Sequence, residues 1–271
     1  MKNIILFLQT KMEKPIAFGW FHILCLSLMA VLIFILHKKK RYNEKQLKII
    51  LAVYGIVALI LEILKQLIWT YNYDFETTKV TWDYNWYAFP FQLCTTPIFV
   101  CIICLFLKKC KIRNYLLSYI SYITIIGSIT TMILPDSCFT NDILVNIHTM
   151  WLHLGSFVVS VYLLMSGEVE LKIKSLIRGF CIFLIFVVIA LSLNVSVYNS
   201  GILNGETFNM FYISPYFTTE LPVFNVVQEN VCYILYLIIY ILALLLGGII
   251  VLSVAYLIKL ILKKVKLDGG K

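Results

Sequence analysis

Apolar residues run through this chain in seven long blocks separated by short polar connections. The blocks cover residues 17–36, 47–69, 88–107, 114–134, 146–166, 176–197 and 231–262. A helix needs roughly 20 apolar residues to cross the hydrocarbon core of a bilayer, and lipid cannot satisfy an open backbone. The pattern predicts an all-α, polytopic membrane helix bundle with about seven transmembrane helices. The last block is longer than one crossing needs, so we expect it to tilt or to project from the membrane.

Composition excludes an ordinary soluble globule. Of the 271 residues, 61% are apolar or aromatic and only 14% are charged, whereas soluble domains carry about a quarter charged residues. The net charge of +9 does not indicate nucleic-acid binding, because the basic residues form short clusters between apolar blocks, as membrane-flanking anchors do.

Charge alternates from one connection to the next. The first, third and fifth connections and the tail are basic, beginning with Lys38, Lys39, Lys40 and Arg41, whereas the second, fourth and sixth are mainly acidic. Basic loops stay in the cytoplasm, which predicts an outward N-terminus and a cytoplasmic C-terminus. Three lysines near the N-terminus weakly oppose this orientation, and residues 4–8 are expected to form an interfacial helix.

The chain is predicted to be one transmembrane domain over residues 1–271, with two special segments. Residues 1–16 are the interfacial segment. Residues 198–230 are a long connection rich in Tyr, Phe, Asn and Pro, and loops of this length are usually functional or disordered. The aromatic residues favour an ordered lid on the outer face over a plain linker.

Five polar side chains fall at a similar depth on five different spans. At about 1.5 Å per helical residue, each lies within roughly 5–10 Å of the predicted outer boundary. Ionisable groups inside a membrane are costly and often functional, so the layer predicts an inward-facing site. Its members are His22, Glu62, Cys94, His153 and Asn194.

Simpler roles stay open for several of these residues. Glu62 and Lys65 are three residues apart and can pair with each other. His148 lies about 140° around the helix from His153 and is expected to be peripheral. Thr149, His153, Ser156 and Ser160 share one helix face, as do Ser121, Thr124, Ser128 and Thr131, and such hydroxyls also knit helices together.

Two prolines bracket Cys94 in the third block, which reads Phe89-Pro90-Phe91-Gln92-Leu93-Cys94-Thr95-Thr96-Pro97. Pro97 is expected to kink this helix beside the cysteine. Cys101 and Cys104 form a CxxC pattern inside an apolar stretch and are expected to pack rather than to bind metal. A disulfide between Cys138 and Cys232 stays open.

Together these residues resemble the YwaF-like integral membrane proteins, which are related to animal transmembrane protein 164, and the resemblance covers nearly the whole chain. The family pattern Leu-Pro-Leu-His-Leu-Cys corresponds to residues 89–94. The other matching positions, in order, are His22, Glu62, Pro135-Asp136, His153 with the following Leu154-Gly155-Ser156, and Asn194. Gln92 departs from the pattern, because the family usually has histidine there.

The resemblance implies an acyltransferase that acts on phospholipid or lysophospholipid through a cysteine and a histidine. Cys94 would be the nucleophile, His153 its base, and Glu62 a supporting catalytic residue. His22, Gln92, Thr149 and Asn194 are the candidate substrate-binding residues.

No cofactor and no metal are expected, although a metal site of His22, Glu62 and His153 is an alternative. Membrane lipids are the expected partners, and the expected location is a bacterial plasma membrane. A second functional hypothesis is a non-enzymatic binder or transporter of a lipid or small molecule that uses the same pocket. A third is a structural protein.

Overall fold

A computed structural model describes residues 2–38, 42–74 and 76–268, with the side chains of the last helix described to residue 264. Lys39, Lys40 and Arg41 lie outside the described residues. Within the described part, six helices are long and apolar enough to cross a membrane. They are α2 (Trp20–His37), α3 (Glu44–Thr70), the continuous helix Lys111–Ile133, α7 (Ile143–Ser166), α8 (Ile173–Asn199) and α10 (Tyr233–Asp268). The predicted all-α polytopic bundle is confirmed.

The third predicted span differs from the others. Its helix, α4 (Thr96–Phe106), has only 11 residues, and a 3-10 turn, η1 (Trp86–Ala88), and an irregular stretch precede it. The predicted kink at Pro97 is wrong, because Pro97 lies in the first turn of α4. The amide hydrogen that proline lacks has no helical partner in a first turn, so the helix begins there without strain.

The fourth span is one helix with a change of winding. It runs from α5 (Lys111–Tyr119) through a π-helical turn, η2 (Ile120–Thr124), into α6 (Ile125–Ile133). The helix packs closely on α8 at Gly179, where an added Cβ would lie 2.6 Å from the backbone oxygen of Ser118. Glycine therefore permits the close approach of α5 and α8.

Smaller elements gather at one end of the bundle. The short helix α1 (Lys2–Leu8) includes the predicted helix at residues 4–8. Strands β1 (Tyr71–Tyr73) and β2 (Val80–Trp82) form an antiparallel hairpin with Tyr71 opposite Trp82. The connection before α10 holds a 3-10 turn, η3 (Met210–Tyr212), and α9 (Phe224–Asn230).

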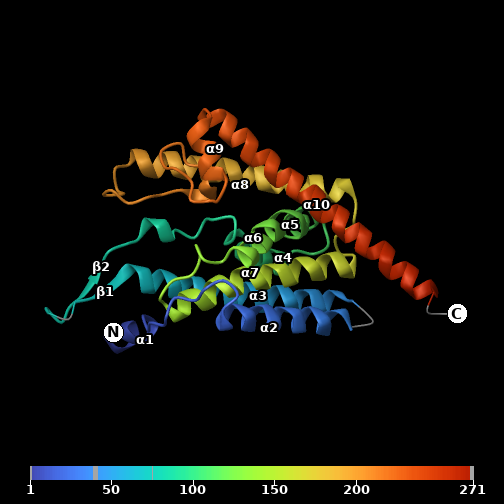
Figure 1. Cartoon of the computed structure of the whole chain (residues 1–271), viewed down its shortest axis with the longest axis horizontal. Helices are drawn as coiled ribbons and strands as arrows, with labels where there is room; N and C mark the ends of the chain where they lie inside the picture. The colour runs from blue at the N-terminus through green and yellow to red at the C-terminus, as the bar shows by residue number, and fades with distance from the viewer. Residues whose placement is uncertain (1, 39–41, 75, 269–271) are drawn as a thin grey trace.

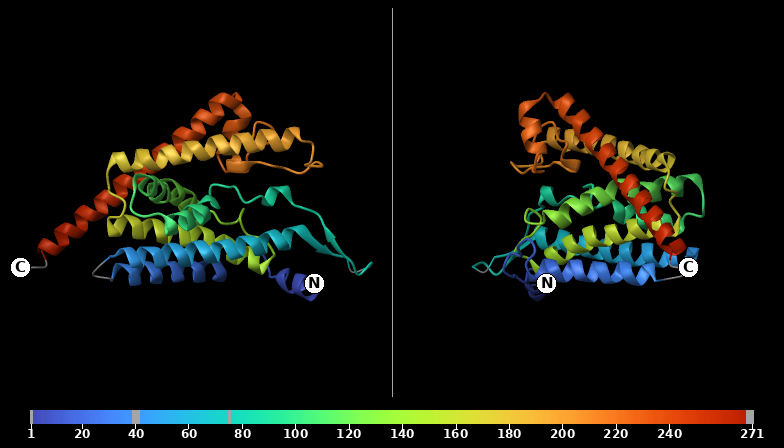
Figure 2. Two further views of the ribbon diagram at one scale, coloured as in Figure 1. Left: turned by 180° about the vertical axis from the view of Figure 1, so that it is seen from behind. Right: turned by 45° about the vertical axis from the view of Figure 1, so that its right-hand side comes forward.

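The long helices run mostly along the longest axis of the molecule, and α10 crosses the others obliquely (Figures 1 and 2). The hairpin and α1 lie at one end, which we call the acidic end because it also holds Asp83, Asp142 and Glu206. The C-terminal part of α10 lies at the other end, the basic end, with Lys109 and Lys172. The acidic and basic connections thus lie at opposite ends, as the charge pattern predicts.

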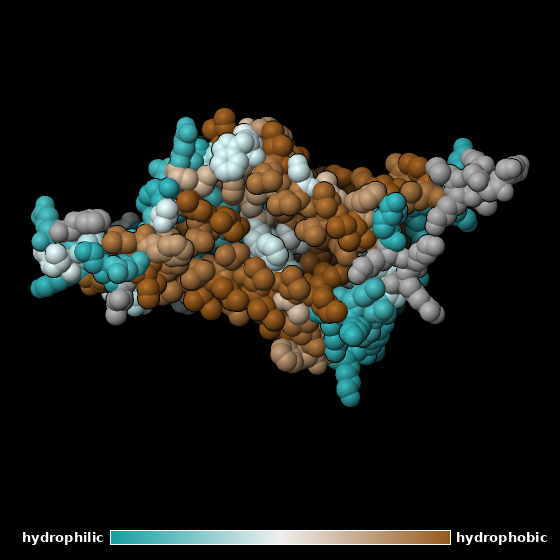
Figure 3. Space-filling view, turned by 90° about the horizontal axis from the view of Figure 1, so that it is seen from below, coloured by the Kyte–Doolittle hydropathy of each residue, from teal (hydrophilic) through white to brown (hydrophobic). Residues whose placement is uncertain are grey.

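The outer surface is apolar between these ends. Figure 3 shows a broad hydrophobic band on one face, with hydrophilic residues at both extremities. Large side chains such as Leu28, Ile60 and Leu242 are more than half exposed on the helices, whereas polar residues such as Ser121 and Asn194 are fully buried. This distribution fits a protein whose surrounding solvent is lipid.

Candidate functional site

A buried charged cluster, formed by Glu62, Lys65, Gln66 and His148, joins α3 to α7 near the acidic end. Glu62 Oε2 lies 2.8 Å from His148 Nε2, and Glu62 Oε1 lies 2.7 Å from Lys65 Nζ. Gln66 Nε2 donates to Glu62 Oε1 at 2.8 Å and to the carbonyl oxygen of Ala88 at 2.6 Å. Both oxygens of the buried carboxylate are therefore paired, which is what makes its burial tolerable.

Two expectations about this cluster change. His148 is not peripheral, because it is buried and contacts Glu62 directly. The histidine that Glu62 orients is thus His148, and the pairing of Glu62 with Lys65 also occurs. The helical rotation of about 140° between positions 148 and 153 turns His153 away from this carboxylate.

Cys94 lies in the turn that precedes α4, and not within a helix. The hydroxyl of Thr95 fixes this turn, since it accepts a hydrogen bond from the Gln92 backbone N–H at 2.8 Å and donates to the Gln92 carbonyl oxygen at 3.0 Å. Cys94 is partly exposed and is close enough to Glu62 and Lys65 for electrostatic interaction. Burial and the Glu62 carboxylate disfavour negative charge on its sulfur, whereas the Lys65 ammonium favours it.

His153 is buried on α7, and no hydrogen bond or ion pair joins it to Cys94 within the described residues. Thr149, one turn before it, is half-buried. The predicted pairing of Cys94 with His153 therefore stays a prediction.

His22 is fully buried on α2 beside Phe139. Its Nδ1 accepts a hydrogen bond from the backbone N–H of Phe18 at 3.0 Å, and its Nε2 has no partner in the described part of the chain. The alternative metal site of His22, Glu62 and His153 is not assembled, because no cluster of three His, Cys, Asp or Glu side chains suited to a metal occurs in residues 2–38, 42–74 and 76–268.

The amides of Gln92 and Asn194 bind the backbone of the long connection. Gln92 contacts Asn209 and Phe211, and Asn194 makes two hydrogen bonds to Met210. Residues 208–213 are thereby held against the bundle with Phe208, Met210, Phe211 and Ile213 buried. Both amides, which we predicted to bind substrate, hold this loop in the structure.

Most of the predicted polar stripes knit the helices. Ser160 Oγ donates to the Ile120 carbonyl oxygen at 2.8 Å, and the hydroxyls of Thr124 and Ser156 lie 3.2 Å apart. The π-helical turn at η2 leaves the Ile120 carbonyl available to this neighbouring helix. All eight cysteines are free, so Cys138 and Cys232 form no disulfide, and Cys101 and Cys104 are buried in the core.

A polar cleft of about 600 Å³ opens at the acidic end. Its walls come from the segment after α1, the end of α3, the β2–η1 segment, the start of α7 and the long connection. Trp69, in one wall, also carries Lys65 Nζ 5.7 Å from its ring centroid, so the cleft adjoins the charged cluster. Burial, and then the nearby Glu220 carboxylate, raise the pKa of the Tyr87 hydroxyl in another wall.

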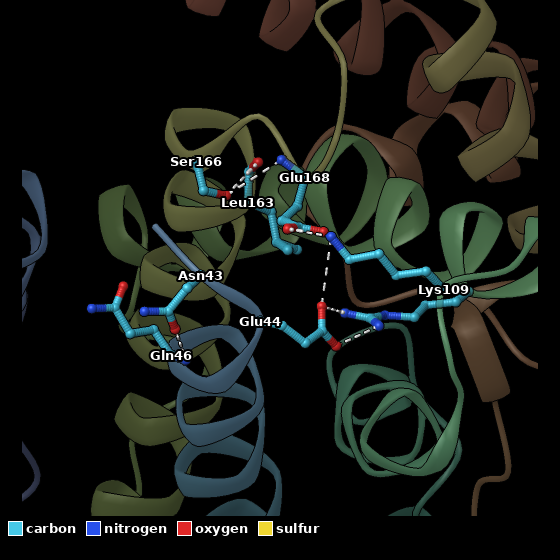
Figure 4. A network of polar contacts seen from close by, with 8 residues as sticks. Asn43, Glu44, Gln46, Lys109, Leu163, Ser166 and Glu168 are labelled. Carbon is cyan, nitrogen blue, oxygen red and sulfur yellow. Dashed lines mark hydrogen bonds and ion pairs between the residues drawn. The ribbon is translucent and has the colours of Figure 1, made fainter. Parts of the chain in front are cut away.

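A second polar network lies at the basic end (Figure 4). Arg113 is buried and makes two hydrogen bonds to the carboxylate of Glu44, at 2.6 and 3.1 Å. Lys109 Nζ lies 3.7 Å from Glu44 and 3.3 Å from Glu168. This network ties α3 to the α4–α5 connection and to the end of α7.

A family model, described as the TMEM164 family, matches residues 16–252, which is most of the chain. The chain belongs to the TMEM164 family. It is an integral, multi-pass membrane protein on both counts, the family and the apolar helices. Neither the curated proteins nor the solved structures gave a match. The expected resemblance to transmembrane protein 164 is confirmed, and the YwaF-like part of the prediction stays untested.

Two residues of this region, His148 and Asn209, make contacts that the sequence does not predict. His148 is buried together with Glu62 and pairs with its carboxylate. Asn209 organises the long connection, since its Oδ1 accepts the backbone N–H of Ser214 at 2.8 Å. Periodic spacing gives no signal for either contact. The first depends on which faces of α3 and α7 turn toward each other, and the second lies in an irregular connection.

Proposed function

We propose that this TMEM164 family member is a membrane-embedded acyltransferase that moves acyl chains between phospholipids and lysophospholipids. Cys94 is the nucleophile and His153 its base. The observation that carries the proposal is the setting of Cys94, which is partly exposed in the turn before α4 and within electrostatic reach of the Lys65 ammonium. Partial access and a nearby cation are features of reactive cysteines, and His153 is the base that removes the thiol proton.

In the first half-reaction, His153 takes the proton of Cys94, and the thiolate attacks the ester carbonyl carbon of a phospholipid. The ester C–O bond breaks, His153 returns the proton to the departing lysolipid oxygen, and the acyl chain is left on Cys94 as a thioester. In the second half-reaction, a lysophospholipid hydroxyl attacks the thioester and loses its proton to His153. The C–S bond of the thioester breaks, the new ester leaves, and His153 returns the proton to the sulfur of Cys94, which restores the thiol.

The surrounding groups support these steps. Glu62 and Lys65 set the charge near the thiol, and the polar cleft beside Trp69 takes the lipid headgroup. His22, with its unpartnered Nε2, and Thr149 contact the substrate. The segment 198–230 covers the site in the outer leaflet of a plasma membrane.

A non-enzymatic lipid binder is the second candidate, and one observation favours it: no hydrogen bond joins Cys94 to His153 in the described residues. In that case the cleft and the charged cluster would hold the lipid, and Cys94 would only line the pocket. Replacing Cys94 would then leave function intact, whereas Glu62→Gln would remove it.

The two candidates separate in a transfer assay with purified protein in lipid nanodiscs. A phospholipid with a labelled acyl chain and an unlabelled lysophospholipid are supplied, and the labelled product is measured by mass spectrometry. Cys94→Ala should abolish transfer while lipid still binds. Cys101→Ala, at a fully buried packing cysteine, is the matched control and should retain transfer. Equal transfer by Cys94→Ala and the wild type would overturn the proposal.

A further inference from the structure

The backbone around η3 is buried although it is neither regular helix nor sheet. Met210, Phe211 and Ile213 have no exposed surface, and Phe211 interrupts the turn with non-helical angles. Buried backbone N–H and C=O groups require hydrogen-bond partners. Here the side chains of Gln92, Asn194 and Tyr236 supply several of them.

Two side-chain amides form hydrogen bonds with the backbone of residues 209–211. From the turn before α4, Gln92 Nε2 donates to the carbonyl oxygen of Asn209 at 2.9 Å, and Gln92 Oε1 accepts the N–H of Phe211 at 2.8 Å. From α8, Asn194 Nδ2 donates to the carbonyl oxygen of Met210 at 3.0 Å, and its Oδ1 accepts the N–H of Met210 at 2.7 Å. Each amide thus uses a donor and an acceptor together.

The gripped segment leads into a strained turn. Phe211 and Tyr212 both have left-handed backbone angles, with φ of 58° and 59°, which residues with a Cβ adopt at an energetic cost. The Tyr236 hydroxyl donates to the Tyr212 carbonyl oxygen at 2.6 Å, and the Phe211 ring lies 5.6 Å from the Phe91 ring. Such strain persists only where the surroundings enforce it, and it is common at functional sites.

The two hydrogen bonds of Gln92 join this strained turn to the turn that carries the candidate nucleophile. Gln92 belongs to the same short turn as Cys94, which the Thr95 hydroxyl closes. Tyr212 interacts electrostatically with Cys94 and with Tyr87. Burial raises the pKa of the Tyr212 hydroxyl, so it stays a neutral O–H group. A movement of Gln92 would therefore shift both the Phe211–Tyr212 turn and the turn that holds Cys94.

We propose that Gln92 is a positioning residue that locks the strained Phe211–Tyr212 turn over Cys94 and thereby controls access to the thiol. The role deepens the proposed acyl transfer and rests on it for its biological meaning. This role also offers a physical reason for glutamine at position 92, where the family pattern has histidine. One amide supplies both the donor to the Asn209 carbonyl oxygen and the acceptor for the Phe211 N–H.

The test measures the rate at which N-ethylmaleimide alkylates Cys94 relative to Cys25, which is partly buried on α2, by peptide mass spectrometry on the full-length protein. Gln92→Met keeps the size of the side chain and removes both hydrogen bonds. Losing two net hydrogen bonds of ordinary strength should raise the Cys94-to-Cys25 ratio about tenfold, since the loop opens more often. A general loss of stability would raise both rates and leave the ratio unchanged.

Gln228→Met is the matched control. Gln228 grips the same connection farther along, through the Thr219 N–H at 2.6 Å and the Phe217 carbonyl oxygen at 3.2 Å, but it is not part of the Cys94 turn. We expect it to change the ratio by less than about twofold, because the strained turn keeps both of its own clamps. Asn194→Leu, which releases the second clamp, should raise the ratio as Gln92→Met does.

Equal ratios in Gln92→Met and the wild type would overturn the positioning role, whatever the acyl-transfer assay shows. If Gln92→Met fails to fold, Gln92→Glu replaces it; that variant keeps the acceptor for Phe211 and loses the donor to Asn209, and its ratio should rise as well. Because alkylation needs no acyl chemistry, a raised ratio with no detectable acyl transfer would sustain the positioning role and refute only the proposed enzyme.

Discussion

The two ends of α3 carry the same type of residue in different surroundings. At the basic end, Glu44 is partly exposed and pairs with Arg113 and Lys109, in a network that ties three segments together. At the acidic end, Glu62 is buried and pairs with His148 and Lys65. In the first network the charged groups pair with one another. The second adjoins a polar cleft, because the Lys65 ammonium lies over the ring of Trp69, which lines that cleft.

The difference separates a structural network from a candidate reaction site. An ion pair that closes on itself stabilises the contact between helices and offers nothing to a ligand. Polar groups that stay available beside a buried charge cost stability, and they are tolerated in a membrane mainly where function needs them. We therefore assign stability to the basic end and chemistry to the acidic end, and four substitutions test this assignment.

The largest expected effect is on acyl transfer at the acidic end. His153→Gln should lower the transfer rate by about 10²- to 10⁴-fold, the range for loss of a general base, with little change in thermal stability. The transfer assay in nanodiscs measures it. If His148→Gln removes transfer and His153→Gln does not, the base is the histidine that Glu62 orients, and our assignment of His153 is wrong.

The second-largest effect should be a lower free energy of unfolding in Glu62→Gln. It leaves the buried ammonium of Lys65 without its counter-charge, and breaking a buried ion pair costs about 3–5 kcal/mol in free energy of unfolding. Denaturant titration in detergent measures the change. The double variant Glu62→Gln with Lys65→Met removes both charges and should recover most of it; a double variant no more stable than the single one would contradict the pairing.

Arg113→Met should have a smaller effect at the basic end. Arg113 is buried, but its partner Glu44 is partly exposed and can be hydrated when the arginine is lost, so we expect about 2 kcal/mol rather than the full cost of a buried pair. The same titration applies, and acyl transfer by the folded variant should equal that of the wild type. A selective loss of transfer would show that the two ends are coupled.

Lys109→Met should have the smallest effect. Its side chain is 66% exposed, and exposed ion pairs contribute about 1 kcal/mol or less. The difference from the wild type should shrink further as salt is raised, because salt screens exposed charges. A loss that is large and independent of salt would mean that Lys109 does more than join a surface network.

Much of the fold follows from the sequence, because hydrophobic blocks and alternating charge are local features. They predict the long helices, the two charged ends and the helix near the N-terminus. The third span is the exception, since Pro97, which suggests a kink within a longer helix, instead lies in the first turn of α4, which begins at Thr96. The sequence alone does not distinguish a proline inside a helix from a proline in its first turn, because the difference depends on how the preceding residues pack.

The candidate site is less accessible from the sequence. Depth along a span predicts that Glu62 and Cys94 lie in one layer, but it does not predict their partners. The partners depend on how each segment is rotated about its axis. In the structure Glu62 pairs with His148, and the side chains of Gln92 and Asn194 bind the loop backbone. Those contacts join positions from 16 to 119 residues apart, beyond the reach of any periodic pattern.

The most direct test of the proposed chemistry is the intact mass of the protein after incubation with mixed phospholipids. We predict an added acyl mass that hydroxylamine removes, that Cys94→Ala lacks and that Cys101→Ala retains, because a thioester on Cys94 is the intermediate of the proposed transfer. If no hydroxylamine-sensitive acyl mass appears on the wild type or on His153→Ala, in which the second half-reaction should be slowed, the acyltransferase is contradicted and the lipid-binding alternative takes its place.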